Sequence, residues 1–185
     1  YKNSSVYDGE WFNDNKHGKG NMYYENGDIY EGGWFDNLKQ GYGEFTSFSG
    51  IVYKGQWLNN KYHGNGELII PMNQKFKKND RGTHKYNGEF KEGIPDGQGI
   101  LLSPESIIIQ KGDFKGTKLH GYGIIYHDDG TIFQQGKFIH GNWYDEIQFQ
   151  IQKYVETNDI SVIHNVNAKE IQSFIEKNYQ IVYHD

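Results

Sequence analysis

The stretch Tyr53-Lys54-Gly55-Gln56-Trp57, followed seven residues later by Gly64-Asn65-Gly66, decides the expected fold of this chain. Alternate residues of a β-strand face the same side, so Tyr53, Gly55 and Trp57 share one face. A glycine in a strand costs about 1 kcal/mol, whereas burying an aromatic ring of about 150–250 Å² at about 25 cal/mol/Å² gains several kcal/mol. We therefore predict that the rings lie over the glycines, which leave room for them.

The same pattern returns about every 23 residues. The other copies of the first element are Tyr7–Trp11, Tyr30–Trp34, Tyr86–Phe90, Gln110–Phe114 and Gln134–Phe138. The Gly-x-Gly element stands at Gly18/Gly20, Gly41/Gly43, Gly64/Gly66, Gly97/Gly99 and Gly121/Gly123. A fixed period of this kind predicts a stacked array of repeats, and such arrays usually hold other molecules rather than transform them.

Turn signals divide each repeat into two strands. Residues 13–17 have turn character, and Asn26-Gly27 is a strong hairpin signal that recurs as Ser49-Gly50 and Asp129-Gly130. Because one hairpin alone is marginal in water, each hairpin should depend on its neighbours. The predicted fold class is all-β, an elongated, single-layer, twisted antiparallel β-meander of about six hairpin repeats. Its open edges require a cap or a partner.

Composition agrees with a thin sheet and narrows the function. Apolar residues make up only 35% of the chain while aromatic residues reach 16%, a share too high for a disordered chain. The net charge of −5 argues against nucleic acid as a partner, and the absence of cysteine excludes disulfides and thiolate metal sites. The chain begins at Tyr1 rather than at methionine, so we expect a fragment or a processed form.

The repeats resemble the MORN repeat, whose pattern is approximately Tyr-x-Gly-x-Trp/Phe-x-x-Gly-Lys-x-His-Gly-x-Gly. The resemblance covers about residues 1–143 and is closest over Tyr7 to Gly20 and Tyr53 to Gly66. The chain departs from the pattern where Gln110 and Gln134 replace the tyrosine, and we expect the sixth unit to lose its second strand at Trp143. Family membership implies roles in assembly, as in radial spoke heads of cilia and in cytoskeletal scaffolds, and in some enzymes the repeats accompany a catalytic domain.

We accordingly predict a non-catalytic scaffold or protein-interaction module and expect no cofactor, since the sequence holds neither a nucleophile–base arrangement nor a phosphate loop. The predicted protein-binding groove is the aromatic face, formed by Tyr7, Trp11, Tyr30, Trp34, Tyr53 and Trp57. For any one ring the alternative is that it only packs the sheet. The histidines His17, His63 and His120 occupy the same predicted turn position in different repeats, about 20 Å or more apart, so we expect no metal site.

Residues 71–85 interrupt the repeats with five cations and one anion inside an acidic chain. Lys75, Lys77, Lys78 and Arg81 are candidates for binding an anionic lipid or an acidic protein surface. The alternative is a solvated loop with no ligand.

The C-terminal residues, 144–185, abandon the repeat and are predicted to form a capping or docking extension. Residues 146–155 fit either a strand or a helix. Residues 167–170 have the form of a capping box and predict a short amphipathic helix over about 168–179. Such a helix would cap the last hairpin or pack on another chain.

The expected partners are other proteins of a larger assembly, with a homo-oligomer as one option and no nucleic acid. We expect a cytoplasmic location on the cytoskeleton or in the axoneme of a cilium or flagellum, an expectation that rests on the resemblance alone. Two alternatives stay open: a membrane-associated module that uses the basic insertion, and a regulatory domain of a larger enzyme.

Overall fold

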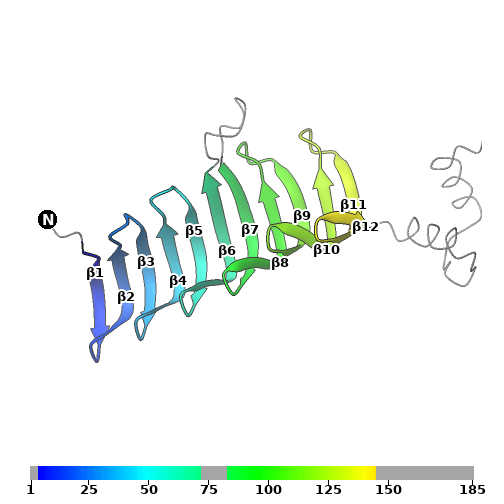
Figure 1. The fold of residues 1–185 in the computed structure, drawn as a ribbon. Coiled ribbons are helices and arrows are strands. Elements are labelled where there is room, and N and C mark those ends of the chain that lie inside the picture. The colour runs from blue at the N-terminus through cyan, green and yellow to red at the C-terminus, as the bar shows by residue number, and fades with distance from the viewer. Residues whose placement is uncertain (1–3, 72–82, 145–185) are drawn as a thin grey trace, which may run out of the picture. The chain divides into compact units, whose positions relative to one another are not determined.

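The structure is a computed structural model and describes residues 4–71 and 83–144. Twelve β-strands form one sheet in which every strand pairs with its neighbours in the chain (Figure 1). The strands are β1 (Val6–Phe12), β2 (Asn15–Tyr23), β3 (Ile29–Phe35), β4 (Leu38–Thr46), β5 (Val52–Leu58), β6 (Lys61–Pro71), β7 (Thr83–Lys91), β8 (Ile94–Leu102), β9 (Ile108–Lys115), β10 (Lys118–Tyr126), β11 (Ile132–Ile139) and β12 (Asn142–Tyr144). The described residues contain no helix, and the predicted all-β antiparallel meander of hairpins is confirmed.

Two kinds of turn alternate along the sheet. The turn between β1 and β2 consists of Asn13 and Asp14, both with positive φ (46° and 60°), and the turns at 36–37 and 59–60 repeat this geometry. Positive φ at both central residues is typical of a two-residue hairpin turn, and Asn and Asp adopt it more readily than other side chains. The predicted turn over residues 13–17 is therefore too long, and His17 lies within strand β2 rather than in a turn.

The second kind of turn closes each repeat at the other end of the strands. Gly27 has a φ of 86°, and its N–H donates to the carbonyl oxygen of Tyr24 over 2.9 Å. Gly50 and Gly130 repeat both the positive φ and the backbone hydrogen bond. The hairpin turns predicted at these three glycines are confirmed.

The tyrosine of each strong repeat lies over its glycines, as predicted. A Cβ added at Gly66 would lie 2.6 Å from the hydroxyl oxygen of Tyr53 and 2.7 Å from two of its ring carbons. Gly55, on the neighbouring strand, faces the same hydroxyl group. Tyr7, Tyr30 and Tyr86 cover the corresponding glycine pairs in their own repeats. Any side chain at these glycines would displace the tyrosine ring that covers them.

In the fifth repeat a residue other than tyrosine covers the glycine. Gln110 stands where the other repeats have tyrosine, and Leu119 from strand β10 takes over the space above Gly123. Leu119 is 1% exposed and belongs to the same buried cluster as the rings. The array therefore continues beyond the last tyrosine with an aliphatic side chain in its place.

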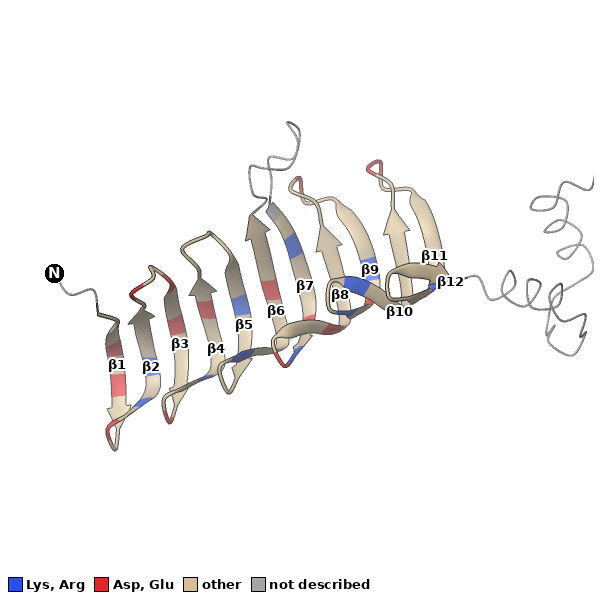
Figure 2. Ribbon diagram, viewed as in Figure 1, with Lys and Arg blue, Asp and Glu red and all other residues tan. Residues whose placement is uncertain are grey.

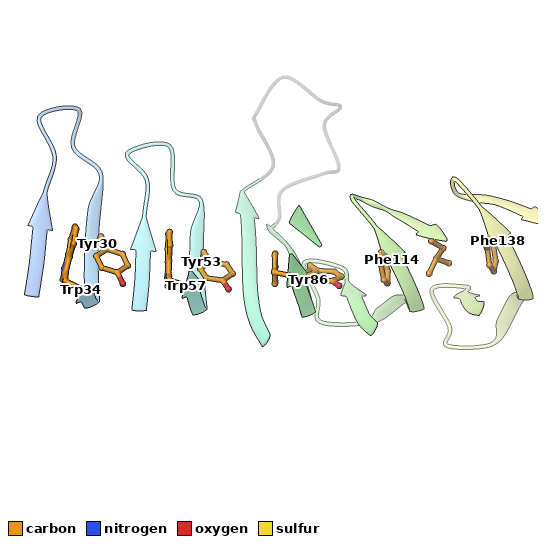
Figure 3. Close-up of a cluster of buried hydrophobic side chains, with 9 residues drawn as sticks. Tyr30, Trp34, Tyr53, Trp57, Tyr86, Phe114 and Phe138 are labelled. Carbon is orange, nitrogen blue, oxygen red and sulfur yellow. The ribbon is translucent and has the colours of Figure 1, made fainter. Parts of the chain in front are cut away.

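The buried side chains form one row that runs from repeat to repeat across the strands (Figure 3). Trp34 meets Tyr7 of the preceding repeat and Tyr30 of its own repeat edge to face, with ring centroids 5.4 and 5.2 Å apart. Trp57 meets Tyr30 and Tyr53 in the same way, at 5.0 and 5.3 Å. Among the described residues, the buried row consists of Tyr30, Trp34, Tyr53, Trp57, Tyr86, Phe90, Phe114, Leu119 and Phe138.

Three predictions about the later part of the chain have different outcomes. The predicted insertion over 71–85 is shorter than expected, because Pro71 pairs with Thr83 and Ile70 with His84 at the ends of β6 and β7. The predicted loss of the second strand in the sixth unit is wrong, because β12 forms over Asn142–Tyr144. The helix predicted at 168–179 and the choice between strand and helix at 146–155 lie outside the described residues.

Candidate protein-binding site

The six residues of the predicted groove divide into two groups. Tyr30, Trp34, Tyr53 and Trp57 are buried, with at most 5% of each side chain exposed. Trp11, on the first strand of the sheet, is 58% exposed, and Tyr7 is half-buried. The four buried rings form the floor of the aromatic face, so a partner would meet the side chains that cover them.

The covering side chains come from the even-numbered strands, two residues before the first glycine of each Gly-x-Gly. We call these residues the covering row: Lys16, Lys39, Tyr62, Pro95 and Leu119. The two lysines stand in the first two repeats, and the other three positions carry an aromatic, a proline and an aliphatic side chain. The chemistry of the aromatic face therefore changes from cationic to apolar along the array.

Each residue of the covering row is held by the turn of the next repeat. The N–H of Asn37 donates to the carbonyl oxygen of Lys16 over 3.1 Å, and the N–H of Asn60 donates to that of Lys39 over 3.2 Å. Gly93 makes the equivalent bond to Tyr62 over 3.0 Å. The backbone of the covering row is thus fixed between repeats.

The first two positions have a second hydrogen bond. The side-chain oxygen of Asn37 accepts from the N–H of Lys16, and that of Asn60 accepts from the N–H of Lys39, both over 2.9 Å. Glycine in the turns after the later repeats cannot make this bond. The backbones of the two lysines are consequently held at both the N–H and the carbonyl oxygen by the asparagine of the next repeat.

Lys39 places its ammonium group among four aromatic rings. Its Nζ lies 4.8 Å from the ring centre of Trp57, 4.9 Å from those of Tyr30 and Phe45, and 5.1 Å from that of Tyr24. Burial lowers the pKa of Lys39 from 10.5 to about 8, an effect that Asp28 opposes. Cation–π attraction compensates in part for the water that this ammonium group has lost.

Lys16 repeats the arrangement one hairpin earlier. Its Nζ lies 5.4 Å from the ring centre of Trp34 and 5.8 Å from that of Tyr7. The ion pairs found within residues 4–71 and 83–144 join His17 to Asp36, Lys54 to Glu44 and Lys61 to Glu92. Neither Lys16 nor Lys39 is among them, although acidic and basic residues are interspersed along the sheet (Figure 2).

An open depression of about 290 Å³ lies beside Lys39 on the aromatic face. Its lining consists of Lys39, Phe45, Trp57, Asn60, Lys61, Tyr62 and Gly93. Tyr62 stacks on Tyr53 with ring centroids 3.8 Å apart, which fixes one wall. Lys61 at the rim is already paired with Glu92 over 2.5 Å. The depression can accept an apolar side chain next to a negatively charged group.

The groove predicted from the sequence consists of floor residues, and Lys39 and Tyr62, which cover that floor, are not among the predicted residues. The signal that could have found them is their shared position two residues before a Gly-x-Gly. The candidate anion-binding residues Lys75, Lys77, Lys78 and Arg81 lie outside the described residues, so their role stays a prediction.

His17, His63 and His120 lie in strands β2, β6 and β10, and the described part of the chain shows no metal-binding arrangement. There, no group of three or more His, Asp or Glu residues could hold an ion. His17 lies between the rings of Phe12 and Phe35, and its Nδ1 is 3.7 Å from Asp36. The same stretches also lack any helix of the length and apolarity that crossing a bilayer requires.

Comparison with known families identifies the repeat unit. The model of the MORN repeat matches residues 7–29, 30–52, 53–75, 86–105 and 111–132, so that each of the five matches begins close to an odd-numbered strand. No curated protein matches the chain. The MORN repeat is in general a non-catalytic module associated with protein or membrane interaction. With five matches that together span more than half of its residues, this chain belongs to the MORN-repeat family.

Proposed function

We propose that this chain is a non-catalytic scaffold that holds a partner protein on its aromatic face, at the depression beside Lys39. The observation that carries the proposal is the depression itself, where Phe45, Trp57 and Tyr62 offer apolar surface beside a desolvated ammonium group. Aromatic side chains in a fixed setting are typical of residues that dominate binding energy.

Pre-organisation supports the same site. The backbone of Lys39 is held on both its N–H and its carbonyl oxygen by Asn60, and Tyr62 is held by Gly93. A surface that is already ordered loses little conformational entropy when a partner binds. This favours the depression over the turn tips as the principal contact.

The setting we propose is a larger assembly of the cytoskeleton, or of a cilium or flagellum, as the resemblance to radial spoke heads and cytoskeletal scaffolds suggests. A repeat array suits this role because its stacked units present similar surfaces at regular intervals. The partner would then be another protein of that assembly.

Site-specific photo-crosslinking tests the proposal. A benzophenone amino acid placed at Lys61, on the rim of the depression and 54% exposed, should crosslink to a partner in extracts of cells that express the protein. The control position is Tyr42, 69% exposed and next to the covered glycine Gly43, so that it faces the opposite side of the sheet. Crosslinks from position 42 alone, or from neither position, would refute binding on the aromatic face.

The basic insertion supports a second candidate function, binding to anionic membranes. Between Pro71 and Thr83 its sequence carries four cations and one anion, and strands β6 and β7 hold its two ends side by side. Sedimentation with phosphatidylserine vesicles should then depend on Lys75, Lys77, Lys78 and Arg81. Equal sedimentation after these four charges are removed would eliminate this candidate.

A further inference from the structure

We infer that Lys16 and Lys39 together recognise two carboxylates on one face of a partner helix, seven residues apart in the partner's sequence. This inference rests on the proposed function, because it specifies what the partner presents to the aromatic face. It adds a second charged contact, at Lys16, and a spacing to a site that already combines apolar surface with the ammonium group of Lys39.

The first step of the argument concerns charge. The ammonium groups of Lys16 and Lys39 lie over aromatic rings, and none of the ion pairs found among the described residues includes either of them. Asp28 acts on Lys39, but its two carboxylate oxygens accept hydrogen bonds from Phe48 and Asn26. A partly desolvated cation gains more from an incoming carboxylate than a fully hydrated lysine does, because it has less water to lose.

The second step concerns spacing. Lys16 on β2 and Lys39 on β4 occupy the same position in successive repeats, two strands apart. Neighbouring strands are about 4.8 Å apart, so equivalent positions in adjacent repeats are separated by about 10 Å. Seven residues of an α-helix rise about 10.5 Å and return to nearly the same face. An extended segment covers about 10 Å in three residues, but those two side chains point to opposite faces.

The third step concerns the next position along the row. Tyr62 on β6 follows Lys39 at the same interval and lines the depression with Phe45 and Trp57. A helix with acidic residues over the two lysines would therefore carry an apolar residue a further seven positions along. Lys16, Lys39 and Tyr62 follow one another across the strands, so the partner's two acidic residues must lie over the lysines and its apolar residue over Tyr62. This order fixes the direction in which the helix lies across the strands.

The test is a selection of peptides from a phage-displayed library of random 20-residue sequences against the 185-residue chain. We expect the selected peptides to carry Asp or Glu pairs seven residues apart, with an apolar residue seven positions beyond one of them. Fluorescence anisotropy with synthetic versions then gives the dissociation constant. Lys16→Met and Lys39→Met keep the aliphatic stem over the rings, and each should weaken binding about ten-fold, which corresponds to 1.4 kcal/mol.

Two further variants act as controls. Lys19→Met removes the same charge from an exposed position of the same strand and should leave the dissociation constant unchanged. Lys39→Arg keeps the charge and should restore most of the affinity lost in Lys39→Met. Raising the salt concentration from 50 to 500 mM should weaken binding to the unmodified chain more than binding to the Met variants.

The possible results separate this inference from the function on which it rests. Suppose that the selected peptides bind the unmodified chain and both Met variants equally but bind the Tyr62→Ser variant more weakly. This result would overturn recognition by the two lysines and would leave the aromatic face as the binding site. Loss of affinity in Lys19→Met to the same extent would mean that net charge alone is recognised, which also overturns the inference. If no peptide is selected, the proposed function fails together with it.

Discussion

Replacing Gly66 with alanine tests the packing on which the whole array depends. Gly66 has no positive φ, so alanine introduces no backbone strain there, and its only effect is the added methyl group. That methyl carbon would lie 2.7 Å from two ring carbons of Tyr53, whereas carbon atoms in contact prefer about 3.5–4.0 Å. The ring would have to move by about 1 Å.

The surroundings of Tyr53 leave little room for this movement. Its ring meets Tyr62 at 3.8 Å, Phe90 at 5.1 Å and Trp57 at 5.3 Å, and its hydroxyl group donates to the carbonyl oxygen of Gln56 over 2.8 Å. Overpacking costs about 1–3 kcal/mol, and a lost hydrogen bond about 1 kcal/mol. Complete expulsion of the ring would cost about 4–6 kcal/mol, from about 150–250 Å² at about 25 cal/mol/Å². We expect Gly66→Ala to lower the free energy of unfolding by about 3 kcal/mol.

Urea denaturation followed by far-ultraviolet circular dichroism measures this loss, and the denaturant dependence checks that the transition stays cooperative. The control is Gly41→Ala, where φ is 77° and nothing lies within 4 Å of the added carbon, so that only backbone strain of about 1–2 kcal/mol applies. In a Tyr53→Ala background the ring is gone, and Gly66→Ala should cost less than about 0.5 kcal/mol. An equal cost of Gly66→Ala with and without the Tyr53 ring would refute the reasoning.

Three further predictions follow from the same contacts. Trp34→Phe should lower the free energy of unfolding by about 1–2 kcal/mol in thermal or urea denaturation, because the hydrogen bond from the indole N–H to the carbonyl oxygen of Gly20 (3.0 Å) is lost. An unchanged free energy of unfolding would mean that this hydrogen bond contributes nothing to stability. Leu119→Ala should lower the free energy of unfolding by about 2–4 kcal/mol in the same assays, because this leucine is 1% exposed and lies above Gly123. A decrease below about 1 kcal/mol would show that the fifth repeat does not need leucine in place of the tyrosine ring. Burial lowers the pKa of Lys39 to about 8, so between pH 8 and 10.5 the folded protein binds fewer protons at this residue than the unfolded chain does. The free energy of unfolding should therefore rise with pH in that window. The rise should end near pH 10, where the tyrosines of the unfolded chain begin to ionise. In the unmodified protein this rise is at most about 2 kcal/mol from pH 7 to 9.5. The neutral variant Lys39→Met and the permanently charged variant Lys39→Arg should both lack it. An unchanged rise in either variant would contradict the assignment to Lys39.

The repeat array could be predicted from sequence because its causes are local. The alternation of Tyr, Gly and Trp along a strand predicts which side chains share a face, and the spacing of 23 residues predicts how the hairpins follow one another. Both are read directly along the chain. The coverage of Gly55 and Gly66 by Tyr53 could therefore be predicted from the sequence.

The proposed binding surface could not be predicted in the same way, because it depends on contacts between repeats. A turn predicted over residues 13–17 takes Lys16 out of the sheet. In the structure the register between β1 and β2 shifts between Gly9 and Trp11, and Lys16 stays in β2 opposite Trp11. Lysine in a polar sequence is also expected to point into water. Nothing in the one-dimensional pattern indicates that Asn60, 21 residues further on, holds the backbone of Lys39.

The edge-to-face contacts along the buried row reach no further than the adjacent repeat: Trp34 meets Tyr7 and Tyr30, and Trp57 meets Tyr30 and Tyr53. Each hairpin thus supplies the surface that the next one needs. In evolutionary terms, a gene segment encoding one such unit could be duplicated or deleted without redesign of the remainder, because every new junction would recreate an old one. The length of the array can then change by one whole repeat at a time, and selection can act on this length without a change in the fold of each repeat.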